Sequence, residues 1–128
     1  MTRINVGICP EELPSKLLLA EHREITRIPN AILNKKVSGK IPDTFTLGKG
    51  HVCFFYNKIQ YLHERYNSLY LECCKRGFNV TQKSSSFEEV QFLRPTLYNS
   101  YIPSLKDRQL LVERIESKGF FLMRNEIE

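Results

Sequence analysis

The stretch that decides the fold is Pro14 to Lys36, with the sequence PSKLLLAEHREITRIPNAILNKK. Apolar side chains recur in it at the three- and four-residue spacing of an amphipathic helix. On a helical wheel of about 100° per residue, one arc collects the side chains expected to face the core, one of them a carboxylate: Leu17, Leu18, Glu21, Ile25, Ile28 and Ile32. Pro14 suits the first turn of a helix, and Pro29 predicts a kink. We therefore expect a helix that begins near Pro14 and runs through Glu24 towards Lys36.

A second helix is predicted from about Lys58 to Arg76, because apolar and aromatic side chains again recur at core spacing: Ile59, Leu62, Tyr66, Leu69 and Cys73. Gly77, directly after it, is typical of a helix C-terminus. A third helix is predicted with Ser104 as its N-cap and Asp107 three residues on, as in a capping box. Gly119 predicts its end.

The rest of the chain is interpreted as loops, including Ser38 to Asp43 and Lys83 to Ser86. Val52 to Tyr56 is the nearest candidate for a strand, but it also fits the start of a buried helix, and no segment sustains the alternation of a strand. The predicted fold class is therefore all-α. We expect a single compact domain, residues 1–128, of three main helices with long connecting loops.

Length and composition agree with one globular domain. The chain has 128 residues, of which 41% are hydrophobic and 26% charged. The longest clean apolar run, Leu17 to Ala20, is far shorter than the ~20 residues of a membrane span, and the N-terminus lacks a secretory pattern. We therefore expect a cytoplasmic protein without membrane partners. The four cysteines and three histidines lack the spacing of a disulfide framework or a zinc site, so neither a metal nor another cofactor is expected.

The charge is distributed unevenly along the chain. The net charge is +5, but residues 1–83 carry 13 Lys and Arg against 7 Asp and Glu, or +6, whereas residues 84–128 carry 6 against 7, or −1. A basic first two-thirds suggests a polyanionic partner.

One edge of the first predicted helix gathers Lys16, Arg23, Glu24 and Arg27. Such an edge is either a solvated face joined by ion pairs or part of a site. Glu21 is unusual because it lies in the apolar arc. A carboxylate there must be paired, near water, or used to orient another group.

Five blocks of sequence, in this order and spacing, carry a resemblance to a known family: Thr2-Arg3-Ile4-Asn5; Ala20-Glu21-His22-Arg23-Glu24 with Arg27; Phe45 to Tyr56, which includes Gly48-Lys49-Gly50-His51; Glu72 to Val80; and, more weakly, Tyr101-Ile102-Pro103. Together they closely resemble the phage endonuclease V family, the pyrimidine-dimer DNA glycosylases with AP-lyase activity. The likeness covers roughly the first 80 residues.

The resemblance implies that the nucleophile is the α-amine of Thr2, exposed when Met1 is removed. An α-amine has an ordinary pKa of about 7.7–8.0, against about 10.4 for lysine, so a useful fraction is neutral near pH 7. The amine attacks C1′ of the deoxyribose, expels the base and forms a Schiff base, from which β-elimination cuts the strand. Glu24 matches the catalytic carboxylate of the family.

The resemblance also implies how DNA is bound. Arg3, Arg23 and Arg27 match family residues that hold phosphates around the kinked lesion, and guanidinium groups suit phosphate oxygens. The implied partner is damaged double-stranded DNA, bound by a monomer without metal.

The sequence also departs from the family pattern. A glutamine and a histidine that approach DNA in relatives are replaced by Lys16 and Leu17, of which only Lys16 can contact a phosphate. The aromatic and basic tail of the family has no counterpart in the ending FFLMRNEIE. Arg114 is a loosely aligned substitute for a DNA-binding lysine of the family. These changes concern lesion specificity and affinity more than the chemistry.

Two alternatives therefore remain beside a dimer glycosylase and AP lyase. One keeps the amine chemistry but acts on other lesions, such as abasic sites or ring-opened purines. The other is a DNA-binding relative without catalysis, in which Met1 is retained.

Overall fold

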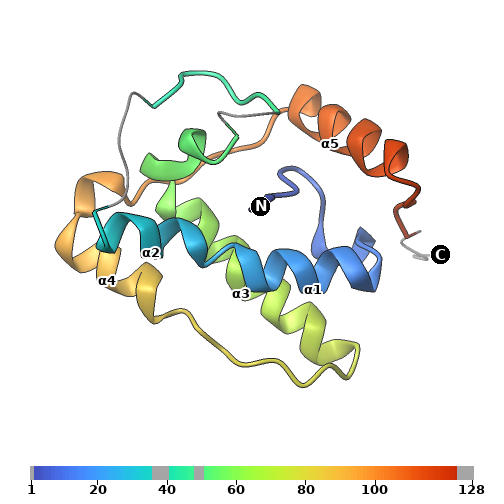
Figure 1. Cartoon of the computed structure of the whole chain (residues 1–128), viewed down its shortest axis with the longest axis horizontal. Helices are drawn as coiled ribbons and strands as arrows, with labels where there is room; N and C mark the ends of the chain where they lie inside the picture. Colours follow the sequence, from blue (N-terminus) through green and yellow to red (C-terminus); the bar gives the residue numbers. More distant parts are fainter. Residues whose placement is uncertain (1, 36–40, 48–50, 124–128) are drawn as a thin grey trace.

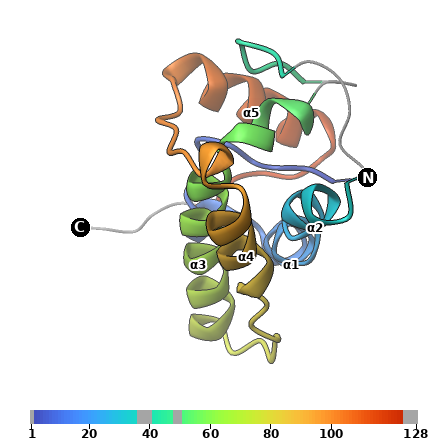
Figure 2. The same cartoon turned by 90° about the vertical axis from the view of Figure 1, so that its left-hand side faces the viewer.

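Helices α1 (Ser15–Glu24) and α2 (Arg27–Leu33) follow one another along one side of a pair formed by α3 (Ile59–Lys75) and α4 (Ser85–Leu93), and α5 (Leu105–Ser117) lies apart from them (Figures 1 and 2). The structure is a computed structural model and describes residues 2–35, 41–47 and 51–123. Short 3-10 helices, η1 (Pro10–Glu12), η2 (Cys53–Asn57) and η3 (Pro95–Leu97), connect these elements. These described residues contain no strand, so the predicted all-α class is confirmed.

The N-terminal arm, residues 2–9, runs through the middle of the molecule between α1 and α5 (Figure 1). Ile4, Val6 and Ile8 alternate along it, and all three are fully buried. The arm is therefore part of the core. Gly7 has a φ of +80°, and a Cβ added there would lie 3.1 Å from the Arg108 backbone of α5. Only a glycine lets the arm turn so close to that helix.

The first predicted helix is divided in two, which corrects the expectation of one kinked helix. Helix α1 ends at Glu24, and α2 begins at Arg27. Pro29 causes the division, although the helix is interrupted several residues before it. Pro29 has no N–H to donate to the carbonyl of Ile25, and its ring clashes with that carbonyl in a continuous helix. The interruption therefore lies near Ile25, and Pro29 lies in the first turn of α2, where a missing N–H costs little.

The other two predicted helices are confirmed. Helix α3 matches the expected Lys58 to Arg76 to within one residue at each end. At the start of α5, Ser104 and Asp107 form the predicted capping box, with the Asp107 N–H donating to Ser104 Oγ at 3.0 Å. The carboxylate of Asp107 in turn accepts the Ser104 N–H at 3.0 Å. Local sequence signals were therefore sufficient to predict the ends of these helices.

The prediction of three main helices was wrong, because α4 begins within the expected loop Lys83 to Ser86. Its inner face buries Phe87 and Val90, and Phe87 packs on the rings of α3. The same short helix leaves Phe92 83% exposed. Because apolar residues occur on both faces, the sequence shows no clear amphipathic period here.

Two smaller predictions concern the loops. Val52 to Tyr56 forms most of η2 and is not a strand. Of the predicted loop Ser38 to Asp43, residues 38–40 lie outside the described part of the chain, as do residues 48–50. No helix within the described residues has both the length and the apolar character needed to cross a membrane.

Candidate active site

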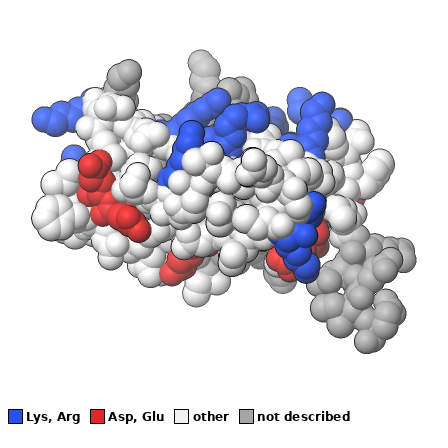
Figure 3. All heavy atoms as spheres, turned by 90° about the horizontal axis from the view of Figure 1, so that it is seen from below, with Lys and Arg blue, Asp and Glu red and all other residues white. Residues whose placement is uncertain are grey.

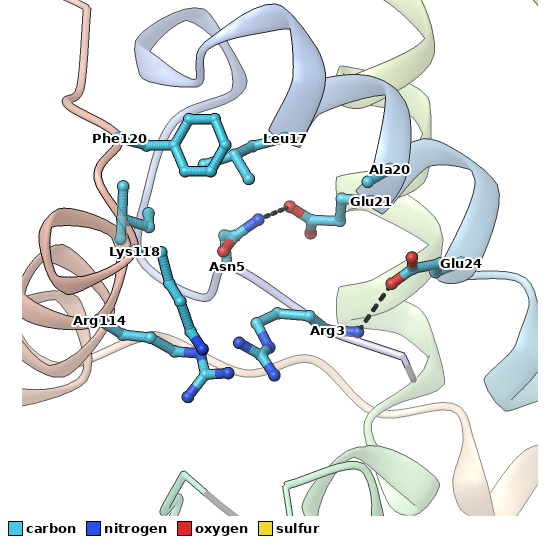
Figure 4. A pocket seen from close by; sticks show the side chains of 10 residues that line it. Arg3, Asn5, Leu17, Ala20, Glu21, Glu24, Arg114, Lys118 and Phe120 are labelled. Carbon is cyan, nitrogen blue, oxygen red and sulfur yellow. Dashed lines mark hydrogen bonds between the residues drawn. The ribbon is translucent and has the colours of Figure 1, made fainter.

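The N-terminal arm meets the end of α1 at Glu24. The backbone N–H of Arg3 donates a hydrogen bond to Glu24 Oε1 at 3.2 Å (Figure 4). The Glu24 side chain is only 15% exposed, and its other oxygen lies 3.6 Å from Nη2 of Arg23. A carboxylate is thus held next to the first peptide groups of the arm, one residue from Thr2.

The arm is held further along by a buried polar network. Asn5 Nδ2 donates to Glu21 Oε1 at 2.8 Å. From α3, Arg65 donates through Nη2 to Glu21 Oε1 at 3.0 Å and through Nη1 to the Ile8 carbonyl at 2.8 Å, and its Nε also donates to Glu21. Glu21 is 1% exposed. Of the three explanations open for a carboxylate in the apolar arc, pairing is the one observed.

His51 holds the arm from the opposite side. Its Nε2 accepts the backbone N–H of Ile4 at 3.0 Å, so the ring is neutral at this atom and carries its proton on Nδ1. Burial lowers the pKa of His51, although the charge of Glu21 raises it in part. Nδ1 is buried and has no hydrogen-bond partner among the described residues. The neutral imidazole is therefore the form that the folded protein favours.

A pocket of about 480 Å³ lies between the arm, α1 and α5, and Figure 4 shows its lining. Its lining residues are Arg3, Asn5, Leu17, Ala20, Glu21, Glu24, Arg114, Ile115, Lys118 and Phe120. At one end, the charged groups of Arg3, Arg114 and Lys118 point towards a common region. At the other end, Leu17 and Phe120 form an apolar wall. The pocket therefore offers a cationic end, an apolar end and two carboxylates.

Four of the predicted site residues meet around this pocket: Thr2, Arg3, Glu24 and Arg114. Arg3, Glu24 and Arg114 line it, and Thr2 precedes Arg3 in the chain. The Nε of Arg114 is buried without a hydrogen-bond partner among the described residues. The loosely aligned Arg114 thus lies on the same pocket as the residues of the N-terminal blocks.

The three other predicted residues lie outside the pocket. Lys16 is exposed in the first turn of α1, with its Nζ 5.8 Å from the centre of the Phe120 ring. Arg23 is 66% exposed, and Arg27 is exposed at the start of α2. These cations fit contacts with an extended polyanion better than contacts with a group inside the pocket.

Arg23 also lines a second pocket, of about 350 Å³, with His22 and Lys83. The ring of His22 stacks on Tyr66 at 5.0 Å, and its Nε2 is buried without a partner in the described residues. Burial, assisted by the charge of Lys83, lowers the pKa of His22. The lining of this pocket thus includes two cations, Arg23 and Lys83, and the neutral ring of His22.

The charge of the surface agrees with this arrangement. In Figure 3, which views the molecule from below Figure 1, most of the visible Lys and Arg side chains lie along one edge of the face. A further Lys and Arg group lies away from that edge, next to acidic side chains. An edge of one sign attracts a polyanion along its length.

Lys118 and Phe120 were missed by sequence reasoning, which took Gly119 only as the end of a helix. Gly119 has a φ of +86° and reverses the chain, after which the Phe120 N–H donates to the Ile115 carbonyl at 3.2 Å. Lys118 lies four residues after Arg114, the spacing that places both on one helix face. That spacing was the signal available in the sequence.

Among the described residues, no group of three or more His, Cys, Asp and Glu side chains is arranged to hold a metal ion. The pocket offers a carboxylate beside the N-terminal arm and cations that can hold an anion.

One comparison with known proteins bears on this site. A family described as pyrimidine dimer DNA glycosylase matches residues 1–86. The match includes the N-terminal arm and α1 to α3, with Glu24, Glu21 and Arg65, and it ends within α4. The part of the pocket that α5 supplies lies beyond it.

The buried His51 predicts an acid-sensitive stability. Because its pKa is lowered in the folded state, the unfolded chain takes up a proton below the ordinary pKa of about 6.5 while the folded protein does not. The contribution of His51 to the free energy of unfolding should therefore be complete above about pH 6.5 and fall as the pH decreases below it, by at most about 1.4 kcal/mol per pH unit. His22, whose pKa is also lowered by burial, adds to the total slope in both proteins.

His51→Gln should reduce this slope, since glutamine still offers an oxygen to the Ile4 N–H but does not titrate. Urea unfolding of both proteins between pH 5 and 8 measures the effect. Equal slopes would show that His51 does not titrate differently on folding.

Proposed function

Because the chain belongs to the pyrimidine dimer DNA glycosylase family, we propose that it cleaves the N-glycosidic bond of the 5′ base of a cyclobutane pyrimidine dimer through a Schiff base on the α-amine of Thr2, and then cuts the strand by β-elimination. The observation that supports this most directly is the hydrogen bond from the Arg3 N–H to Glu24. It places a carboxylate one residue from the proposed nucleophile, at the edge of a pocket that carries cations.

The nucleophile requires removal of Met1, which lies outside the described residues. The exposed α-amine then has an ordinary pKa near neutrality. The side chains of Arg3, Arg23 and the other nearby cations oppose its protonation by like-charge repulsion. A larger neutral fraction of the amine is thus available for attack at physiological pH.

The proposed first step forms a bond from the Thr2 nitrogen to C1′ and breaks the bond from C1′ to the base. The bonding electrons leave with the base, which takes up the proton that the amine loses. The C1′–O4′ bond then breaks, the ring oxygen keeps its bonding electrons and takes up a proton from water, and the nitrogen lone pair forms the protonated imine with C1′. Positive charge develops on C1′ and then on the imine nitrogen. The Glu24 carboxylate is close enough to the arm to stabilise that charge and to accept a proton.

In the second step a proton leaves C2′ and the 3′ carbon–oxygen bond breaks, so that the 3′ phosphate departs with the bonding electrons. The protonated imine accepts the electrons released at C2′, which lowers the barrier. Glu24 is the candidate base for that proton, and water then hydrolyses the imine and frees the amine.

The bound form in this proposal is damaged double-stranded DNA on a single copy of the chain. Arg3 and Arg114 would hold the phosphates next to the reacting sugar, since both line the pocket. Lys16, Arg23 and Arg27 would contact phosphates further along the duplex. Phosphate contacts position the protein on the duplex and do not themselves specify the lesion.

Borohydride trapping on two labelled duplexes tests the function, because the reagent reduces an imine to a stable covalent adduct. One duplex carries a cyclobutane thymine dimer and the other an abasic site. We expect adducts on both, and peptide mapping should place them on Thr2. Intact mass first shows that the protein used lacks Met1.

The alternatives predict other patterns. Trapping on the abasic duplex alone would leave an AP lyase that does not act on dimers. Absence of an adduct on both, from protein that begins at Thr2, would leave a DNA-binding relative without this chemistry.

Glu24→Gln should bind damaged DNA like the wild type but lose strand cleavage by at least about a hundredfold, the range of a lost general base. Glutamine keeps an oxygen for the Arg3 N–H, so the arm stays in place while the charge and the base are lost. Single-turnover cleavage and filter binding measure the two effects. Glu88→Gln, an exposed substitution on α4, is the matched control. Normal cleavage by Glu24→Gln would remove Glu24 from the chemistry.

Arg27→Ala should weaken DNA binding and flatten its salt dependence by about one counterion. The reason is that each neutralised phosphate releases a counterion from the duplex. Binding titrations between 50 and 200 mM salt give the slope. Lys75→Ala, at the exposed end of α3, should leave the slope unchanged. If both variants behave alike, Arg27 does not face the DNA.

A further inference from the structure

The buried network around Arg65 reaches the N-terminal arm at two points. Arg65 contacts the carbonyl of Ile8 directly and contacts Asn5 through Glu21. Arg65 and Glu21 are separated by 44 positions in the sequence, so α1 and α3 are joined here. The Glu21 carboxylate therefore accepts hydrogen bonds both from Arg65 of α3 and from Asn5 of the arm.

Glu21 and Glu24 lie three residues apart, on the same face of α1. Glu21 binds the side chain of Asn5, and Glu24 binds the backbone of Arg3. The same helix turn therefore holds the arm at two nearby points. The bond from Asn5 lies two residues along the arm from the bond at Arg3.

Other contacts already keep the arm in the core. Ile4, Val6 and Ile8 are fully buried, and His51 accepts the Ile4 N–H. These contacts anchor the arm but do not reach the Glu21 side of it. The arm would thus stay buried without the hydrogen bond from Asn5 to Glu21.

We propose that Asn5 is a positioning residue which, through Glu21 and Arg65, sets the distance between the α-amine of Thr2 and the carboxylate of Glu24. This inference rests on the proposed function, because it assumes that the amine is the nucleophile. A misplacement of about 1 Å between reacting groups can reduce a rate by as much as a hundredfold. The network would therefore affect the rate of imine formation and leave DNA binding unchanged.

Asn5→Ala removes the contact with Glu21 but leaves the ion pair between Glu21 and Arg65. We expect the rate of trapping on an abasic duplex to fall at least tenfold, with the dissociation constant for the same duplex within twofold of the wild type. Asn67→Ala, an exposed asparagine on α3, is the control. The rates are compared well below the melting temperature of each variant, so that all of the protein is folded.

Asn5→Asp separates positioning from stability. Its carboxyl group next to Glu21 should have a raised pKa, because two carboxylates in contact repel one another. When protonated, its O–H can donate to Glu21 as the asparagine does, and when ionised it cannot. The ratio of trapping rates, Asn5→Asp over Asn5→Ala, should therefore exceed one in acid and fall below one as the pH rises. The pKa of the α-amine is measured separately in each variant from the pH dependence of its trapping rate, because an ionised Asp at position 5 also favours the protonated amine.

The two levels of the proposal fail in different ways. If the wild type forms no adduct, or forms it away from Thr2, the proposed function is wrong. If the wild type is trapped on Thr2 but Asn5→Ala is trapped at the same rate, or the ratio of the two variants does not change with pH, the positioning role is wrong.

Discussion

The structure depends on the buried contact between Arg65 of α3 and Glu21 of α1. Removing two charges from water costs several kcal/mol for each ion, so such a pair is tolerated only when its hydrogen bonds are also made. Here the remaining partners are Asn5 and the carbonyl of Ile8, both on the N-terminal arm. The arm therefore supplies two hydrogen-bond partners of the pair, and the pair in turn helps to hold the arm. The two helices and the arm must come together in one arrangement.

This requirement explains how the first residues of the chain can be held in a fixed place beside the candidate active site. A terminal segment is ordinarily among the least ordered parts of a domain. This arm is instead anchored by the buried side chains of Ile4, Val6 and Ile8. It is also held by polar contacts from α1 and from His51. In the proposed function the reacting amine lies only two residues before the first of these anchors. The core of the fold is thus also the support of the chemistry.

Two separate segments of the chain supply the residues that line the pocket. The arm and α1 supply Arg3, Glu21 and Glu24, which lie within the 86 residues that match the family. Helix α5 and the turn after it supply Arg114 and Phe120, which lie beyond the match. The segment that carries the proposed chemistry is therefore the family part. The opposite wall, which faces whatever enters the pocket, belongs to the remaining third of the chain.

Local rules were sufficient where the signal lay within a few residues. The capping box at Ser104 and the glycine after α3 predicted helix ends correctly, because these signals satisfy backbone groups of the same helix. They were insufficient at α4, whose inner face is defined by packing against α2 and α3. They also misplaced the effect of Pro29, because a missing hydrogen bond is felt four residues earlier.

The sequence by itself determined the all-α class, the positions of α3 and α5, and the residue blocks that identify the family. It also showed that Glu21, a carboxylate in an apolar arc, had to be paired, near water or used to orient another group. Only the tertiary structure decided that Glu21 is paired with Arg65, 44 positions away, and that Lys118 and Phe120 turn back to the pocket. Helix periodicity and capping involve neighbours in the chain. Contacts between distant segments depend instead on how whole elements pack, and no local pattern records that packing.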